Sequence, residues 1–194
     1  MKNIKLLSAL ALSLGVLAAG AASAASSTGG TITFDGVVTD STCPVNGGVG
    51  TDGGAGNFSV RLPQVATTDL ATVNAKAGTV PFTIDIGTPG DTTPCAGAGK
   101  VARVTFLTSS PNINGVNGML NNALSGEASN VNVQLLSGTG AGTVIDLTTQ
   151  ANFDGSAFAN GVSKVPFQAQ YVAVGGAATA GLVQTSVIYG LSYN

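Results

Sequence analysis

The stretch Gly181-Leu-Val-Gln-Thr-Ser-Val-Ile-Tyr-Gly-Leu-Ser-Tyr-Asn194 alternates between two kinds of side chain at successive positions. A period of two sustained over this length predicts a β-strand with one buried face. No further strand follows in this sequence, so we expect the far edge of this one to be open or covered by another element. The face expected to point inward carries Gly181, Val183, Thr185, Val187, Tyr189, Leu191 and Tyr193.

Shorter strand-like runs recur through the rest of the chain, separated by clusters of Gly, Pro, Asn and Ser. This spacing predicts an all-β sandwich. Helix is expected only as a turn or two, within residues 68–77 and 118–124. Pro81 and Pro166 are expected at strand starts, where a missing N–H is tolerated. The strand-like runs are residues 57–62, 80–86, 100–107, 130–136, 143–147 and 165–174.

The first 24 residues have the pattern of a secretory signal peptide. A short basic start precedes an apolar run over residues 6–22, and Ala22-Ser-Ala24 supplies a small-residue cleavage site. A membrane-spanning helix is the alternative, because the run is close to spanning length. The small residues at the end of the run, with no charged anchor after them, favour the signal peptide. We therefore expect residues 1–24 to be removed and the mature chain to begin at Ala25.

Charge is scarce, since Asp, Glu, Lys and Arg together make up 8% of the chain. Without Lys2 and Lys5 of the signal peptide, five basic residues face nine acidic ones, a net charge of −4. A nucleic-acid partner is not expected, because it would require a clustered basic face. A surface made of Gly, Ser, Thr, Asn and Gln is typical of an exported, tightly packed or repeatedly stacked protein.

Cys43 and Cys95 are the two cysteines of the chain. In an exported protein an isolated pair predicts a disulfide. Closing a loop of this length would stabilise the fold by roughly 4 kcal/mol. A metal site is the alternative, but the chain has no His and no C-x-x-C spacing.

Residues that would support catalysis or cofactor binding are missing or isolated. The absence of His excludes Ser-His-Asp and Cys-His arrangements, and the acids stand singly rather than as a glycosidase pair. Gly97-Ala-Gly-Lys100 lacks the upstream Gly and the following Ser or Thr of a phosphate-binding loop. The glycine-rich residues 47–56 match one incomplete copy of a Ca²⁺-binding repeat, so a flexible loop is expected there. We expect neither an enzyme nor a bound cofactor or metal.

Four features taken together resemble the structural subunits (pilins) of chaperone–usher fimbriae, and are most similar to the type 1 fimbrial major-subunit group. The glycine-rich residues 47–56 are a departure from that group. The four features are Gly29-Gly-Thr-Ile-Thr-Phe-Asp-Gly-Val-Val38 before Cys43, the cysteine pair, Val165-Pro-Phe-Gln-Ala-Gln-Tyr171, and a final strand with Gly181 and a penultimate Tyr193.

The resemblance implies an all-β, incomplete immunoglobulin-like sandwich that lacks its final strand. A periplasmic chaperone would fill the resulting groove temporarily. In the fibre, the leader of the next subunit would replace the chaperone strand (donor-strand exchange). The implied partners are thus the chaperone, an outer-membrane usher and neighbouring subunits. The implied function is that of a structural subunit of a surface fimbrium, exported through the periplasm and supporting cell adhesion.

The leader has the residues that such a donor strand would need. Thr28, Gly30, Ile32 and Phe34 share one phase of an alternating segment. The expected organisation is a signal peptide (1–24), a donor-strand extension (25–35) and a pilin domain (36–194), with residues 181–193 in the acceptor groove. Two alternatives for the leader are a disordered N-terminus and a strand folded back into its own groove.

The sequence also allows a different function. The rival hypothesis is a carbohydrate- or receptor-binding β-sandwich module, or a minor tip or adaptor subunit. Sugar-binding faces usually present aromatic platforms, whereas the chain has no Trp and three Tyr. A tip adhesin of this family would carry an additional receptor-binding domain and lack a donor leader.

Overall fold

The computed structural model describes residues 43–194. The predicted signal peptide and donor-strand extension lie outside the described residues. Within residues 43–194, no helix combines the length and the apolar character needed to cross a membrane.

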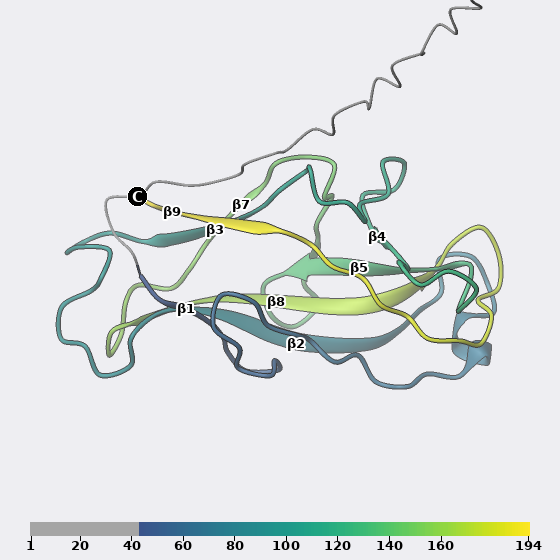
Figure 1. Cartoon of the computed structure of the whole chain (residues 1–194), viewed down its shortest axis with the longest axis horizontal. Helices are drawn as coiled ribbons and strands as arrows, with labels where there is room; N and C mark the ends of the chain where they lie inside the picture. Colours follow the sequence, from purple (N-terminus) through teal and green to yellow (C-terminus); the bar gives the residue numbers. More distant parts are fainter. Residues whose placement is uncertain (1–42) are drawn as a thin grey trace, which may run out of the picture. The chain divides into compact units, whose positions relative to one another are not determined.

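Two antiparallel sheets form a sandwich, as the alternating runs predict (Figure 1). The short 3-10 helix η1 (Thr67–Leu70) lies before β2. The larger sheet has the order β1-β2-β8-β5-β4, with β6 also paired to β5; the smaller has the order β7-β3-β9. The strands are β1 (Val45–Gly47), β2 (Lys76–Gly87), β3 (Ala102–Phe106), β4 (Leu120–Asn121), β5 (Val131–Ser137), β6 (Thr143–Val144), β7 (Asn152–Asp154), β8 (Val162–Ala173) and β9 (Tyr189–Tyr193).

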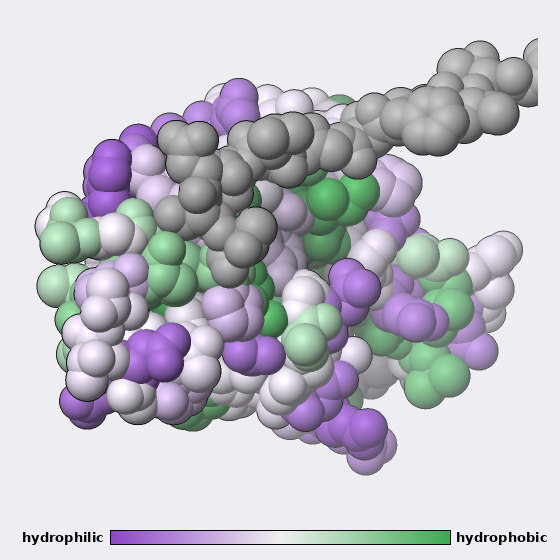
Figure 2. All heavy atoms as spheres, turned by 60° about the vertical axis from the view of Figure 1, so that its left-hand side comes forward, coloured by the Kyte–Doolittle hydropathy of each residue, from purple (hydrophilic) through white to green (hydrophobic). Residues whose placement is uncertain are grey.

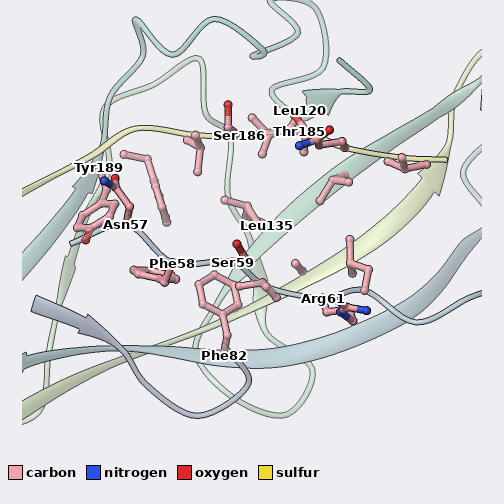
Figure 3. A pocket seen from close by; sticks show the side chains of 18 of the residues that line it. Asn57, Phe58, Ser59, Arg61, Phe82, Leu120, Leu135, Thr185, Ser186 and Tyr189 are labelled. Carbon is pink, nitrogen blue, oxygen red and sulfur yellow. The ribbon is translucent and has the colours of Figure 1, made fainter. Parts of the chain in front are cut away.

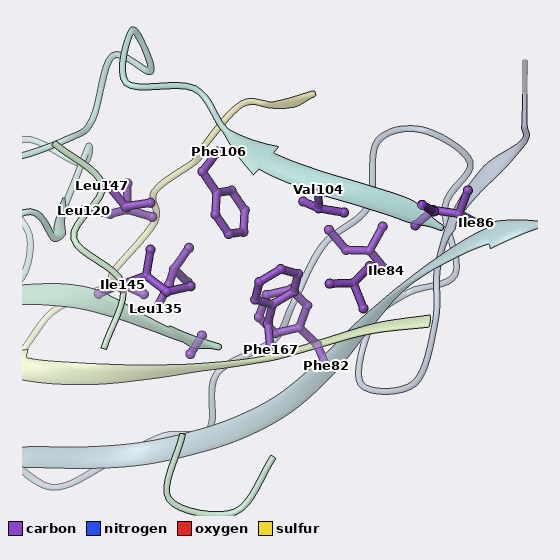
Figure 4. Packing of buried hydrophobic residues seen from close by; sticks show 14 of the residues in the cluster. Phe82, Ile84, Ile86, Val104, Phe106, Leu120, Leu135, Ile145, Leu147 and Phe167 are labelled. Carbon is purple, nitrogen blue, oxygen red and sulfur yellow. The ribbon is translucent and has the colours of Figure 1, made fainter. Parts of the chain in front are cut away.

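The core fills the space between the sheets around a group of four Phe rings. Phe167 of β8 stacks on Phe82 of β2 at 5.6 Å between ring centroids, and these residues face each other in the strand register. From the smaller sheet, Phe106 and Phe153 contact the Phe167 ring edge-on, at 5.1 and 5.3 Å. Figure 4 shows aliphatic side chains on both sides of this group, with Ile84 and Ile86 on one side and Leu135 on the other. The packed aromatic centre holds the two sheets together.

Cys43 and Cys95 form the predicted disulfide, with their Cα atoms 5.3 Å apart. Cys43 directly precedes the β1 region, and Cys95 lies in the loop between β2 and β3. The bond therefore ties the start of the described chain to the turn that connects the two sheets.

Pro81 and Pro166 are not at strand starts, as the sequence had suggested, but within the two twelve-residue strands β2 and β8. Both positions tolerate proline because each lies beyond the end of the neighbouring strand, where no ladder hydrogen bond is lost. The Pro166 oxygen accepts from Gly138, which lies just beyond the end of β5. Pro81 lies past the end of β1 on the edge of the sheet.

Much of the surface is weakly polar, as the low charge predicts. Figure 2 shows a face on which nearly white and lilac residues predominate, with hydrophobic residues exposed among them. The two ion pairs among residues 43–194 join Arg103 to Asp154 and Lys164 to Asp85. The Arg103 guanidinium lowers the pKa of the Asp154 carboxyl through their hydrogen bonds.

Candidate strand-acceptor groove

The residues before β9 were predicted as one continuous strand from Gly181, but regular pairing begins only at Tyr189. The alternation is nevertheless present, because even-numbered side chains from Leu182 to Ile188 are exposed and odd-numbered ones are half-buried. On one side, three main-chain oxygens of this segment accept hydrogen bonds from the region between β3 and β5. The pairs are Ala128 N to Leu182 O (3.3 Å), Ala123 N to Gln184 O (2.8 Å) and Leu107 N to Ile188 O (2.9 Å).

The opposite side of the same segment is unpaired. Among residues 43–194, the main-chain N–H and C=O groups of Val183, Thr185 and Val187 make no hydrogen bond. The buried hydroxyl of Thr185 also has no partner within the described part of the chain. Unpaired groups along an inward-facing edge are what a further strand would satisfy. Residues 183–189 are called the C-terminal rim below.

A second segment with an unpaired side lies across the groove from it. Residues 57–62, the N-terminal rim, were predicted to be a strand, but they form only an isolated bridge between Val60 and Thr51. Their burial alternates, with Phe58, Val60 and Leu62 half-buried and the residues between them exposed. Within residues 43–194 the main-chain groups of these three inward residues are also without hydrogen bonds.

The glycine-rich residues 47–56 hold the N-terminal rim from outside. The Asp52 N–H donates to the Ser59 oxygen at 3.1 Å, and the Ser59 N–H donates to Asp52 Oδ1 at 3.0 Å. The main-chain N–H groups of Ser59 and then Gly54 lower the pKa of the Asp52 carboxyl. This loop is therefore a structural support for the rim, and the Asp52 carboxylate is engaged by hydrogen bonds from the Gly54 and Ser59 N–H groups.

Between the two rims lies a groove of about 650 Å³ (Figure 3). Phe82 and Leu135 rise from the larger sheet into the floor, while Phe58 and Thr185 lie on opposite rims. The floor is apolar, so alternate side chains of an added strand would be buried on it. Its residues include Phe82, Ile84, Phe106, Leu120, Leu135 and Ala169.

One end of the groove is closed by a contact between the rims. The Tyr189 hydroxyl donates to the Gly56 oxygen, and the Tyr189 ring lies 5.9 Å from that of Phe58. Burial at this end raises the pKa of the Tyr189 hydroxyl.

The predicted acceptor residues fall into three places. Val183, Thr185, Val187 and Tyr189 line the groove together. Leu191 and Tyr193 instead lie in β9, paired with Val104 and Ala102 of β3. Gly181 lies outside the groove lining, at φ +153°, where a side chain would collide with the main chain of Ala128.

The predicted donor residues Thr28, Gly30, Ile32 and Phe34 lie outside the described residues. The role of the N-terminal rim was not predicted from the sequence, although an alternating strand was predicted there. The signal that could have revealed it is the phase of Phe58, Val60 and Leu62, which matches a half-buried strand. Within residues 43–194, no three His, Cys, Asp or Glu side chains lie together as metal ligands would.

Comparison with a family model and with individual known proteins points to fimbrial proteins in both cases. The family described as "Fimbrial protein" matches residues 32–194. The major fimbrial subunit SMF-1 of Stenotrophomonas maltophilia (strain K279a) is 37% identical over 182 residues, covering 88% of this chain and 96% of the relative. The type-1 fimbrial protein, A chain, of Escherichia coli (strain K12) is 34% identical over 194 residues, covering 98% of this chain and 99% of the relative.

Two solved structures share the fold. A chain from a chaperone–usher pilus structure that addresses rod uncoiling has a TM-score of 0.53 and 16% identity, covering 86% of this chain and 96% of that one. The P pilus rod subunit PapA has a TM-score of 0.50 and 16% identity, covering 72% of this chain and 94% of that one. The predicted all-β, incomplete immunoglobulin-like sandwich is therefore confirmed.

Proposed function

Because this chain belongs to the fimbrial protein family, we propose that its groove accepts a β-strand from a neighbouring subunit during fimbrial assembly. The protein is a structural subunit of a fimbrium. The observation that carries the proposal is the groove itself, in which an apolar floor lies between two rims with unpaired main-chain groups.

An added strand would satisfy both needs of this site. Its main chain would hydrogen-bond to the exposed edge, and its alternate side chains would fill the apolar floor and fix the register. Residues 25–35 of a second copy supply suitable side chains in Ile32 and Phe34, while Gly30 would fit where the groove is shallow. Burying the two large residues would contribute about 1.5–3 kcal/mol each.

The same groove would be occupied by other strands before assembly. A periplasmic chaperone would lend its own strand, and an outer-membrane usher would direct the exchange. In this scheme residues 1–24 direct export and are removed, residues 25–35 act as the donor, and residues 36–194 form the acceptor domain. The subunit would reach the cell surface through the periplasm, would support adhesion as part of the fibre, and would have no catalytic activity.

Deleting residues 25–35 while keeping the signal peptide tests the proposal. The truncated subunit should be exported and bound by the chaperone but should be unable to fill a neighbour's groove, so fibres should be absent by electron microscopy. Replacing Ser26 and Ser27 with Ala is a matched control that should leave fibres intact. Normal fibres from the deletion would contradict the donor role of the leader.

A further inference from the structure

Arg61 is the one charged residue that lines the groove in the part of the chain that the structure describes. Its side chain is exposed and alternates with the inward-facing Val60 and Leu62, so it lies at the mouth rather than on the floor. No ion pair or hydrogen bond engages Arg61 within residues 43–194. A cation is therefore available beside the position where a strand would enter.

The leader also carries a single charge. Asp35 is the one charged residue in residues 25–35. Its phase is opposite to that of Gly30, Ile32 and Phe34, because successive side chains of a strand point to opposite faces. If the latter three face the floor, Asp35 faces the mouth of the groove, on the same side as Arg61.

The direction of the strand decides whether the two charges meet. Phe58 contacts Tyr189 at one end, and Val65 packs against the same small cluster as Val183 at the other, so the rims run antiparallel. A leader antiparallel to the C-terminal rim runs from Tyr189 towards Val183, which brings its later residues to the Arg61 end. In the reverse direction Asp35 would lie near Asn57, about 13 Å away at the rise of a strand.

We propose that Asp35 of one subunit forms an ion pair with Arg61 of the subunit whose groove it fills. This inference rests on the proposed function, since it requires the leader of a second copy in the groove. The pair fixes the direction and register of the incoming strand, because the reversed strand leaves both charges unpartnered. Complementary charges commonly set orientation in this way while adding little affinity.

Charge reversal on purified fibres of the full chain tests the pair. The variants are Arg61→Asp, Asp35→Lys and the double variant, with Lys100→Asp as a control that makes the same charge change as Arg61→Asp away from the groove. The measurement is the rate at which fibres dissociate in urea, an uncharged denaturant, at low and high NaCl. An exposed pair changes such rates by up to about fivefold at low salt, and salt screens the effect.

Each single reversal should speed dissociation by up to about fivefold at low salt relative to Lys100→Asp, and high salt should remove the difference. The double variant should return to the wild-type rate. If a single variant makes no fibres, recovery of fibres in the double variant supports the pair, and lack of recovery overturns it. Single variants that match Lys100→Asp would also overturn it.

Val187→Asp, assayed alongside, separates this inference from the proposed function. If Val187→Asp abolishes fibres while the charge reversals have no effect, the groove function holds and the ion pair is wrong. If Val187→Asp still assembles normal fibres, the proposed function fails, and the ion pair fails with it.

Discussion

The Tyr189 hydroxyl donates a hydrogen bond to the main-chain oxygen of Gly56, and this contact joins the two rims at one end of the groove. The groove is therefore closed at the Tyr189 end by the chain itself. A strand that fills it must stop at, or displace, this contact.

Replacing Tyr189 with Phe should remove the hydroxyl bond and keep the ring against Phe58. A typical hydrogen bond contributes about 1 kcal/mol, so the free energy of unfolding of the monomer should fall by about that amount. Urea denaturation at neutral pH measures it. Tyr171→Phe is the control, because within residues 43–194 the Tyr171 hydroxyl makes no hydrogen bond. An equal loss in both variants would contradict the role of the contact.

The stability of the fold should decline in alkaline solution. Burial raises the pKa of Tyr171, Tyr189 and Tyr193 above the ordinary value of 10.0. The folded chain therefore keeps these tyrosine protons at pH values at which the unfolded chain releases them. The contribution of the tyrosines to the free energy of unfolding is full below pH 10 and is lost as the pH rises through the folded pKa values. Urea midpoints measured at increasing pH should fall above about pH 10. They should fall less steeply in Tyr189→Phe, and equal slopes would count against this assignment.

The sequence predicts the long strands of the larger sheet. The runs at 80–86, 130–136 and 165–174 correspond to β2, β5 and β8, because their alternation matches one buried face. β1 and β7 were not predicted. These strands have three residues each, too few to show a period.

The two rims show why side-chain alternation alone does not predict the strand-acceptor groove. Residues 57–62 and 181–188 alternate as strands do, yet they form no regular ladder. Their outer sides bond to loop segments and side chains, and their inner sides face the groove unpaired. Side-chain periodicity reports burial of a face, whereas pairing depends on a neighbour that the local sequence does not specify. For the same reason Leu191 and Tyr193 share the phase of the groove residues but lie in β9, beyond the groove lining.

The segment expected to form one or two helical turns at 118–124 contains the short strand β4 instead. There the pairing of Leu120 with Val133 of β5 overrides weak local helix propensity. The other such segment, 68–77, is helical only over η1 and then enters β2.

Gly181→Ala should destabilise the fold more than a glycine substitution at a position with open space around it. At φ +153° the new Cβ would meet the main chain of Ala128, so both strain and a collision arise. The expected loss in free energy of unfolding is about 2 kcal/mol or more. Gly53→Ala is a matched control, since Gly53 also has positive φ but open space around it, and it should cost about 1 kcal/mol. Equal losses would show that the collision is relieved.

Replacing both Cys43 and Cys95 with Ala should lower the free energy of unfolding by about 2–5 kcal/mol. The disulfide constrains the unfolded chain and ties the β1 region to the β2–β3 loop. Thermal unfolding of the monomer measures the effect, and a reducing agent should destabilise the wild type but not the variant. Unchanged stability would show that packing alone holds these segments.

A charge placed on the groove side should block assembly. Val187→Asp would bury an unpaired carboxylate on the inner side of the C-terminal rim when a strand is added, at a cost of several kcal/mol. Ile188→Asp is the matched control, since that neighbouring side chain points outward and is 49% exposed. Fibre yield by electron microscopy should be abolished in the first variant and preserved in the second, and the reverse order would contradict the assigned faces.

The most direct test of the central claim is a cryo-electron microscopy map of the assembled fibre. We expect a strand from a neighbouring subunit, containing Ile32 and Phe34, between residues 57–62 and 183–189. Its main chain should be hydrogen-bonded to Val183, Thr185 and Val187. An empty groove, or one filled by the leader of the same subunit, would contradict the account.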